Sequence, residues 1–161
     1  MAKKSQVAMP ISHPATWIFR GDPREFDLIG YLNADLPRIS WTLRQHQHDV
    51  EIGDEVYIWQ SRGKRRRPSG IIGRARIASA PFKGIDRDAL PYWRVGLGLR
   101  ADETRVWLTV EDAVESITSH RVVSRESLLT DTECRALRVL TGRGTNSFVH
   151  PHEAERLRML W

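Results

Sequence analysis

The clearest chemical signal in this 161-residue sequence is a basic run, Arg62-Gly-Lys64-Arg65-Arg66-Arg67. The chain has 25 basic and 20 acidic residues and a net charge of +5, so this segment accounts for the whole excess. Short runs of this kind bind the phosphates of nucleic-acid backbones, although a solvated loop that aids solubility has the same composition. Charge therefore favours nucleic acid as the partner, with phosphate-binding residues Arg62, Lys64, Arg65, Arg66 and Arg67.

Tryptophan is the second signal, because six indoles are many for a chain of this length. Five fall on segments predicted as strands: Trp17, Trp41, Trp59, Trp93 and Trp107. Each one alone is typical of a half-buried position in a core. A small barrel has little room for five indoles, so we expect one or two to line a cleft and stack on a planar base.

Catalytic and metal-binding patterns are weak by comparison. His46-Gln-His48 and His150-Pro-His152 could each place two imidazoles on one strand face, but no cysteine or carboxylate frame accompanies them, so we predict no metal site. Gly142-Arg-Gly144 lacks the third glycine of a dinucleotide fingerprint and follows a predicted helix. The single cysteine, Cys134, excludes an internal disulfide. Since no pattern indicates a catalytic residue or a cofactor, a binding module is favoured over an enzyme.

Local patterns predict the elements that position these residues. Strands are predicted at segments rich in β-branched and aromatic residues, 16–19, 39–43, 56–59, 70–77, 92–99 and 105–110. Segments 56–59 and 70–77 are expected to form an antiparallel hairpin with the basic run at its tip. Helices are predicted from capping signals and helical spacing, starting at Asp22-Pro23, after Thr130-Asp-Thr-Glu133 and at Pro151.

This order of elements favours an α+β domain over residues 16–161, built around a mostly antiparallel sheet or barrel. Residues 1–15 contain two prolines and few large apolar groups, so they are predicted to be a disordered leader. The sequence has neither an apolar run of about 18 residues nor the apolar core of a secretory signal. We therefore expect a cytoplasmic protein with no membrane partner.

In their order and spacing, these motifs resemble the EVE domain family of the PUA-like superfamily, which is related to the YTH domains. The matching pieces are Trp17-Ile-Phe-Arg-Gly-Asp-Pro23, Ile39-Ser-Trp41, Ile52-Gly-Asp54, Val56-Tyr-Ile-Trp-Gln-Ser61, Gly70-Ile-Ile-Gly-Arg-Ala75, Ser79-Ala-Pro81 and Gly144-Thr-Asn-Ser-Phe148. The resemblance covers residue 16 to the C-terminus. It implies a small, mostly antiparallel PUA-like β-barrel with flanking helices.

The same resemblance implies a non-catalytic module that reads a modified base, a modified cytosine or adenine such as 5-methylcytosine or N6-methyladenine, in DNA. Such modules flip the base into an aromatic cage, for which the family pattern identifies Trp41 first, and then Thr42, Trp59, Gln60, Ser61, Trp17, Asn146 and Phe148. It also implies a restriction-system or nuclease partner. The chain departs from the family in carrying His150 where threonine or serine usually caps the last helix.

Two alternatives from other classes remain. A PUA-type RNA-binding module that recognises a modified nucleoside fits the charge equally well, because RNA and DNA both present phosphates. A PUA-like enzyme, such as an ASCH-type hydrolase, resembles the chain less, because its Gly-x-Lys-x-x-Glu-x-Arg motif is absent here.

Overall fold

The computed structural model describes residues 10–63, 67–95 and 102–161. In that part of the chain the strands are β1 (Thr16–Gly21), β2 (Ile39–Thr42), β3 (Glu55–Gln60), β4 (Gly70–Ile77), β5 (Phe82–Lys83), β6 (Thr104–Ala113), β7 (Val123–Ser124) and β8 (Asn146–Val149). The α-helices are α1 (Leu28–Leu32), α2 (Arg125–Thr130) and α3 (Pro151–Leu160), and the 3-10 helices are η1 (Leu90–Tyr92) and η2 (Arg138–Thr141).

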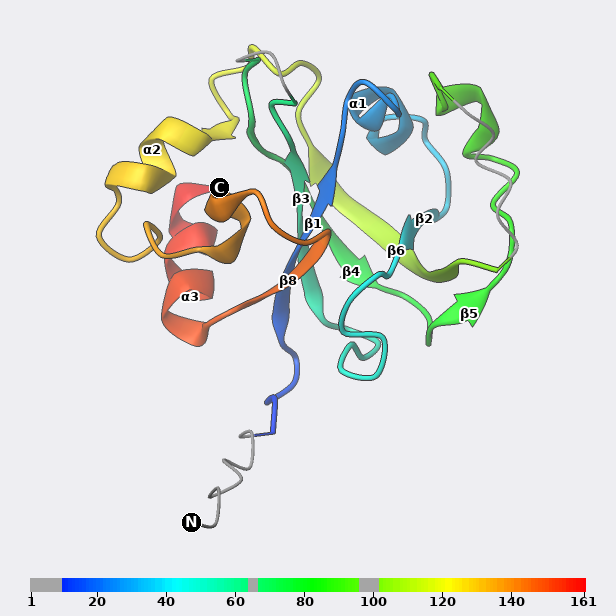
Figure 1. Cartoon of the computed structure of the whole chain (residues 1–161), viewed down its shortest axis with the longest axis horizontal. Helices are drawn as coiled ribbons and strands as arrows, with labels where there is room; N and C mark the ends of the chain where they lie inside the picture. Colours follow the sequence, from blue (N-terminus) through cyan, green and yellow to red (C-terminus); the bar gives the residue numbers. More distant parts are fainter. Residues whose placement is uncertain (1–9, 64–66, 96–101) are drawn as a thin grey trace, which may run out of the picture.

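All of these strands belong to one curled sheet in the order β2-β6-β4-β3-β1-β8, with β5 beside β6 and β7 beside β4. β1 and β3 run parallel, whereas the other named strand pairs are antiparallel. Figure 1 shows the sheet curled into a half-barrel, with α1 on one side of β1 and with α2 and α3 on the other side. The predicted α+β class and mostly antiparallel sheet are confirmed.

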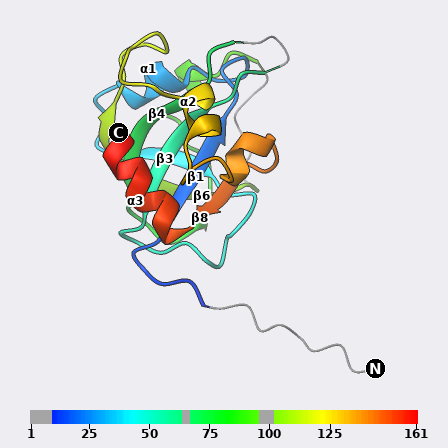
Figure 2. The ribbon, with the colours of Figure 1, turned by 90° about the vertical axis from the view of Figure 1, so that its left-hand side faces the viewer.

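The alternation of side chains along β1 and β3 supplies two cores on opposite faces of the sheet. Trp17 and Phe19 of β1 join Ile58 of β3 in the inner core, together with residues of α1. Ile18 and Trp59 belong instead to the outer core, which includes buried side chains of α2, α3 and η2. Figure 2 shows these helices lying over the outer face of the sheet. One short strand therefore contributes to both layers.

The first helix begins later than the predicted start at Asp22. α1 starts at Leu28, and Asp27 caps it by accepting a hydrogen bond from the backbone N–H of Gly30 at 3.1 Å. Residues 22–26 form a turn instead, in which the N–H groups of Glu25 and Phe26 donate to the carbonyl of Asp22. The N–H of Asp27 then donates to the carbonyl of Tyr92, and the carbonyl of Glu25 accepts from the N–H of Arg94. A contact distant in sequence thus uses the backbone groups that an earlier helix would need.

The predicted strand over 92–99 is wrong in its described part. Leu90–Tyr92 forms η1, and Trp93 makes one isolated bridge with Phe26. Residues 96–99 lie outside the described residues. The hairpin of β3 and β4 is confirmed, with a bulge between Ile58 and Trp59.

The C-terminal third also differs from the expected pattern. The helix predicted after Glu133 is instead a turn followed by η2, although Asp131 does accept a hydrogen bond from the backbone N–H of Cys134 at 3.1 Å. The unpredicted helix α2 precedes this turn and is capped by Ser124. The helix predicted at Pro151 is confirmed as α3.

The segment 10–15 has no helix or strand, but it contacts the domain. The carboxylate of Asp54, buried at the end of the β2–β3 connection, lies 2.8 Å from Nδ1 of His13 and accepts from the backbone N–H of Ala15 and from Nε1 of Trp17. Residues 1–9 of the predicted leader lie outside the described residues. Among the described residues, no helix has both the length and the apolar character needed to cross a membrane.

Candidate functional site

A cavity of about 280 Å³ opens at the inner side of the curled sheet, between β1, β2, α1 and the segment that contains η1. Its aromatic walls are Phe26, Tyr31, Trp41 and Trp93, and its polar lining includes Asp22, Glu25, Ser40, Thr42, Ser61, Arg20, Arg44 and Arg105. Small-ligand sites start at roughly 300 Å³, so this volume suits one small planar group. The combination of flat apolar walls with a few hydrogen-bonding groups is typical of such sites.

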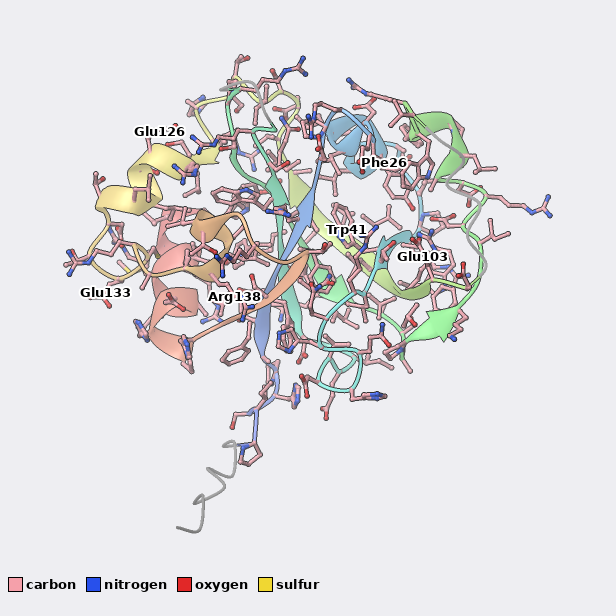
Figure 3. All side chains as sticks on the ribbon, in the orientation of Figure 1. Phe26, Trp41, Glu103, Glu126, Glu133 and Arg138 are labelled. Atoms are coloured by element: carbon pink, nitrogen blue, oxygen red, sulfur yellow. The ribbon has the colours of Figure 1, made fainter. Side chains whose placement is uncertain are left out.

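Two indoles enter the cavity from separate elements. Trp41 lies on β2, which pairs with β6, and only 7% of it is exposed. Trp93 follows η1 and is held by its bridge to Phe26, whose ring lies edge-on at 5.0 Å. Figure 3 shows Phe26 and Trp41 in the same half of the molecule, away from α3. Strand pairing fixes Trp41, whereas contacts of a connecting segment fix Trp93.

A buried carboxylate, that of Asp86, holds two side chains that line this cavity. Asp86 accepts hydrogen bonds from the hydroxyls of Tyr31 and Ser40, the latter at 2.7 Å. The hydroxyl of Tyr31 in turn accepts from the backbone N–H of Ser40 at 2.9 Å. Burial, with Asp86 beside it, raises the pKa of Tyr31, so this hydroxyl keeps its proton. The three residues therefore fix the strand position directly before Trp41.

Glu103 lies beside the cavity and connects several of its polar side chains. Its carboxylate accepts a hydrogen bond from Nη2 of Arg105 at 3.2 Å and a long one from the hydroxyl of Thr42 at 3.5 Å. Arg105 is 4% exposed, and its Nε donates to the carbonyl of Gly84. Because a buried guanidinium is stable only when paired, this arrangement fixes a positive charge in the wall next to Thr42.

A second cavity, of about 290 Å³, adjoins the first and shares Arg20, Asp22 and Ser61 with it. Its other lining residues are Arg24, Trp59, Arg62, Gly63, Ser69, Arg125, Val139, Leu140, Thr141 and Gly142. Many of them come from the outer face of the sheet and from η2. The two cavities thus meet where β1 ends.

The predicted cage residues divide between these cavities. Trp41, Thr42 and Ser61 line the first one. Trp59 does not share it, because the alternation along β3 turns this indole into the outer core, where it lines the second cavity and is 2% exposed. The structure therefore does not bring Trp41 and Trp59 together, because Trp41 belongs to the inner core and Trp59 to the outer core.

The remaining predicted cage residues line neither cavity. Trp17 is fully buried in the inner core, where its Nε1 donates to Asp54, so it is a core residue rather than a cage wall. Phe148 packs edge-on against it at 5.5 Å. Asn146 is 2% exposed and joins β8 to the end of β2, and Gln60 is buried between β1 and β4.

The predicted phosphate-binding residues are described only in part. Arg62 is exposed and lines the second cavity, whereas Arg67 is exposed and lines neither. Lys64, Arg65 and Arg66 lie outside the described residues. Among the described residues there is no group of three or more histidine, cysteine or acidic side chains arranged to hold a metal ion.

Sequence reasoning missed several cavity residues. Trp93 was predicted to lie on a strand, and neither Phe26 nor Tyr31 was predicted as a site residue. Arg20 lies within the segment 17–23 that resembles the EVE family but was not predicted as a site residue, and Arg44 lies in none of the matching segments. Spacing could not reveal them, because the cavity forms between segments that are distant along the chain.

Comparison with known proteins defines the class of fold. No protein-family model and no curated protein sequence matches the chain. Solved structures do match: a hypothetical protein from Leishmania major has a TM-score of 0.63 and 19% identity, and covers 91% of this chain and 94% of that one. The likeness shows the predicted α+β, PUA-like fold of EVE-type domains.

Two further matches are structures of nucleic-acid complexes. One is human THYN1 protein in complex with 5-methylcytosine containing DNA, with a TM-score of 0.62, 13% identity and coverage of 91% of this chain and 96% of that one. The other is the YTH domain of Zygosaccharomyces rouxii MRB1 in complex with N6-methyladenosine RNA, with a TM-score of 0.50, 11% identity and coverage of 94% and 89%.

Proposed function

We propose that this chain is a non-catalytic binding module that holds one modified base of DNA in the first cavity. The observation that carries the proposal is the pair of indoles, Trp41 and Trp93, in a cavity of about 280 Å³ that also contains hydrogen-bonding and cationic side chains. A flat base fits between aromatic walls, and arginines near the opening attract the phosphates that flank it. Solved structures with this fold include complexes with methylated DNA and methylated RNA, which supports the proposal.

Energetics explain why an enclosed cavity is needed. Extruding a base costs a few kcal/mol, and stacking on an aromatic side chain returns about 1–3 kcal/mol. Burying one methyl group adds only about 0.8 kcal/mol, which is about a fourfold preference over the plain base. Discrimination therefore depends on how closely Trp41 and Trp93 surround the modified position.

Polar groups of the lining select which base enters. Asp22 and Glu25 line the cavity, and carboxylates accept from the exocyclic amine of cytosine. Ser61 and Thr42 add hydroxyls that both donate and accept. We propose modified cytosine as the first base to test, with N6-methyladenine as the second.

A module of this kind recognises its target without cutting it. In our proposal the chemistry on the nucleic acid belongs to a partner, a restriction-system nuclease that this domain directs to modified sites. Incubation of the chain with a modified oligonucleotide and Mg²⁺ is therefore expected to leave the mass of the oligonucleotide unchanged. Cleavage or loss of the modification would contradict the non-catalytic part of the proposal.

The test is a binding titration by fluorescence polarisation with matched labelled single strands and duplexes. They carry cytosine, 5-methylcytosine, 5-hydroxymethylcytosine, adenine or N6-methyladenine at one position, in DNA and in RNA. We expect one modified DNA to bind several-fold more tightly than its plain counterpart. Tighter binding of a modified RNA would favour the RNA-binding alternative, since the 2′-hydroxyl distinguishes the two.

Leucine variants locate the site. Trp41→Leu and Trp93→Leu keep an apolar side chain but lose the flat face, and both are expected to abolish the preference for the modified base. Trp107→Leu is the matched control, because Trp107 stacks on Phe82 at 5.3 Å outside both cavities. Equal, salt-sensitive binding of the wild-type chain to every strand would overturn the proposal.

A further inference from the structure

The second cavity has a composition that differs sharply from the first. Among the described residues, four guanidinium groups line it, those of Arg20, Arg24, Arg62 and Arg125, against one carboxylate, that of Asp22. That carboxylate is neutralised by Arg24, whose Nη2 lies 2.6 Å from it and which holds the pKa of Asp22 below its usual value. The cavity therefore presents an excess of positive charge to any occupant.

A buried hydroxyl points to the kind of occupant. Ser69 is 3% exposed and lines this cavity, yet its Oγ has no hydrogen-bond partner in the described part of the chain. A buried polar group without a partner lowers stability unless a ligand satisfies it. A hydroxyl donor and several guanidinium groups in the lining of one cavity match the oxygens of a phosphate.

The position of Ser69 is set by close backbone packing. Its carbonyl accepts a hydrogen bond from the backbone N–H of Arg125 at 3.0 Å. The next residue, Gly70, lies so close to β7 that a Cβ there would be 2.3 Å from the carbonyl oxygen of Val123. Only glycine permits this approach, which brings Ser69 and Arg125 into one wall.

Two of the arginines are held in place before any ligand binds. Nη2 of Arg125 donates to the carbonyl of Leu140 at 3.0 Å, and Nη1 of Arg20 donates to the carbonyl of Gly142. Leu140 lies in η2 and Gly142 directly follows it, so this short helix orients both arginine side chains. A guanidinium has five N–H groups, which leaves donors on each arginine for a second partner.

We propose that the second cavity binds the backbone phosphate next to the base held in the first cavity. This inference rests on the proposed function, because the phosphate belongs to the nucleic acid whose base occupies the first cavity. Because the cavities share Arg20, Asp22 and Ser61, an occupant of one lies beside an occupant of the other, as a base and its own phosphate do. The volume of about 290 Å³ exceeds that of a phosphate, and Trp59, Val139 and Leu140 offer apolar contacts to the sugar.

The experiment replaces single backbone phosphates by neutral methylphosphonates. One set of single-stranded DNA carries one 5-methylcytosine, and an otherwise identical set carries cytosine. For the wild-type chain we expect one linkage beside the target base to weaken binding about tenfold when neutralised, whereas more distant linkages have small effects. Because the phosphate site does not depend on the methyl group, the same linkage should stand out in both sets.

Variants assign that linkage to the cavity. Ser69→Ala removes a hydroxyl that has no protein partner, so the fold should be retained while the sensitivity to that linkage decreases. Arg125→Gln should abolish the sensitivity to neutralisation of that linkage. It should also make the slope of log K against log[salt] less negative by about 0.7. Arg138→Gln is the matched control, because it removes the same charge from η2 but outside the cavity. Figure 3 shows Arg138 in the half of the molecule that contains α3.

The outcomes separate this inference from the proposed function. If no single linkage stands out, or if Ser69→Ala and Arg125→Gln keep the full wild-type sensitivity, the phosphate site is overturned even when the modified base is still preferred. If one linkage stands out in both sets while 5-methylcytosine and cytosine bind equally, the phosphate site stands and the 5-methylcytosine assignment fails. A third outcome is that inorganic phosphate binds the wild-type chain although no single methylphosphonate weakens DNA binding. This result would indicate a site for the free anion and overturn the inference.

Discussion

Asn146, the first residue of β8, donates from Nδ2 to the carbonyl of Thr42, the last residue of β2, at 3.1 Å. These strands lie at opposite ends of the path through the curled sheet and share no ladder. Oδ1 of Asn146 also accepts from the backbone N–H of Arg44 at 2.8 Å. One side chain therefore joins the two edges of the half-barrel and fixes Thr42 at the wall of the first cavity.

Asn146→Ala should accordingly loosen this closure. The variant leaves the carbonyl of Thr42 and the N–H of Arg44 without their partner, and we expect the free energy of unfolding to fall by about 2 kcal/mol. Binding of the preferred oligonucleotide should weaken several-fold, because Thr42 lines the cavity. Urea unfolding and polarisation titrations measure the two effects.

Ser116→Ala is the control for that substitution. It removes two hydrogen bonds within an exposed turn, both between Ser116 and Thr118. Neither of these residues lines a cavity. We expect little change in stability and none in binding. An unchanged urea midpoint for Asn146→Ala would show that this residue does not hold the edges together.

Trp41 and Trp59 should respond differently to replacement by leucine, because they lie in different cores. Both variants lose packing and therefore stability, by about 2–3 kcal/mol. Only Trp41→Leu should remove the discrimination between modified and plain strands, whereas Trp59→Leu should keep the ratio of the two Kd values. A loss of that ratio in Trp59→Leu, at a temperature where the variant is folded, would place both indoles in one site after all.

Tyr31→Phe tests the buried network behind the first cavity. The change removes the hydroxyl that donates to Asp86 and accepts from the N–H of Ser40, so we expect a loss of about 2 kcal/mol in unfolding free energy. Tyr92→Phe is the control, since the ring of Tyr92 packs on Tyr31 at 5.3 Å and stays in place. Equal stability of the two variants in urea would mean that the network contributes nothing.

The pH dependence of stability should report on His13. The hydrogen bond to Asp54 is the main cause that raises the pKa of His13 above its ordinary value of 6.5. Because the folded state has the higher pKa, the stabilisation is fully present below pH 6.5 and is lost as the pH rises through the folded-state pKa.

We therefore expect the free energy of unfolding of the wild-type chain to decline as the pH rises above about 6.5, and the decline to be smaller in His13→Ala. Urea unfolding at a series of pH values measures both curves. Identical slopes for the two chains would contradict a contribution of His13 to folding.

Local patterns in the sequence determined much of this protein. The strands around Trp17, Trp41 and Trp59, the hairpin of β3 and β4 and the helix that starts at Pro151 follow from residue type and period, because these features depend on neighbours close along the chain. The motif order also indicated the fold that the structure shows. Trp41, Thr42 and Ser61, which line the first cavity, were identified through the resemblance to the EVE family.

Only the tertiary structure decided which side chains meet. The alternation along β3 says that Ile58 and Trp59 face opposite ways, but not which of them faces the inner side of the curled sheet. Trp93 reaches the cavity because backbone pairing with residues 25–27 shortened one predicted helix and replaced one predicted strand. These are contacts between segments more than 60 residues apart, and the free energy that selects them comes from burial and hydrogen bonding that local sequence does not encode.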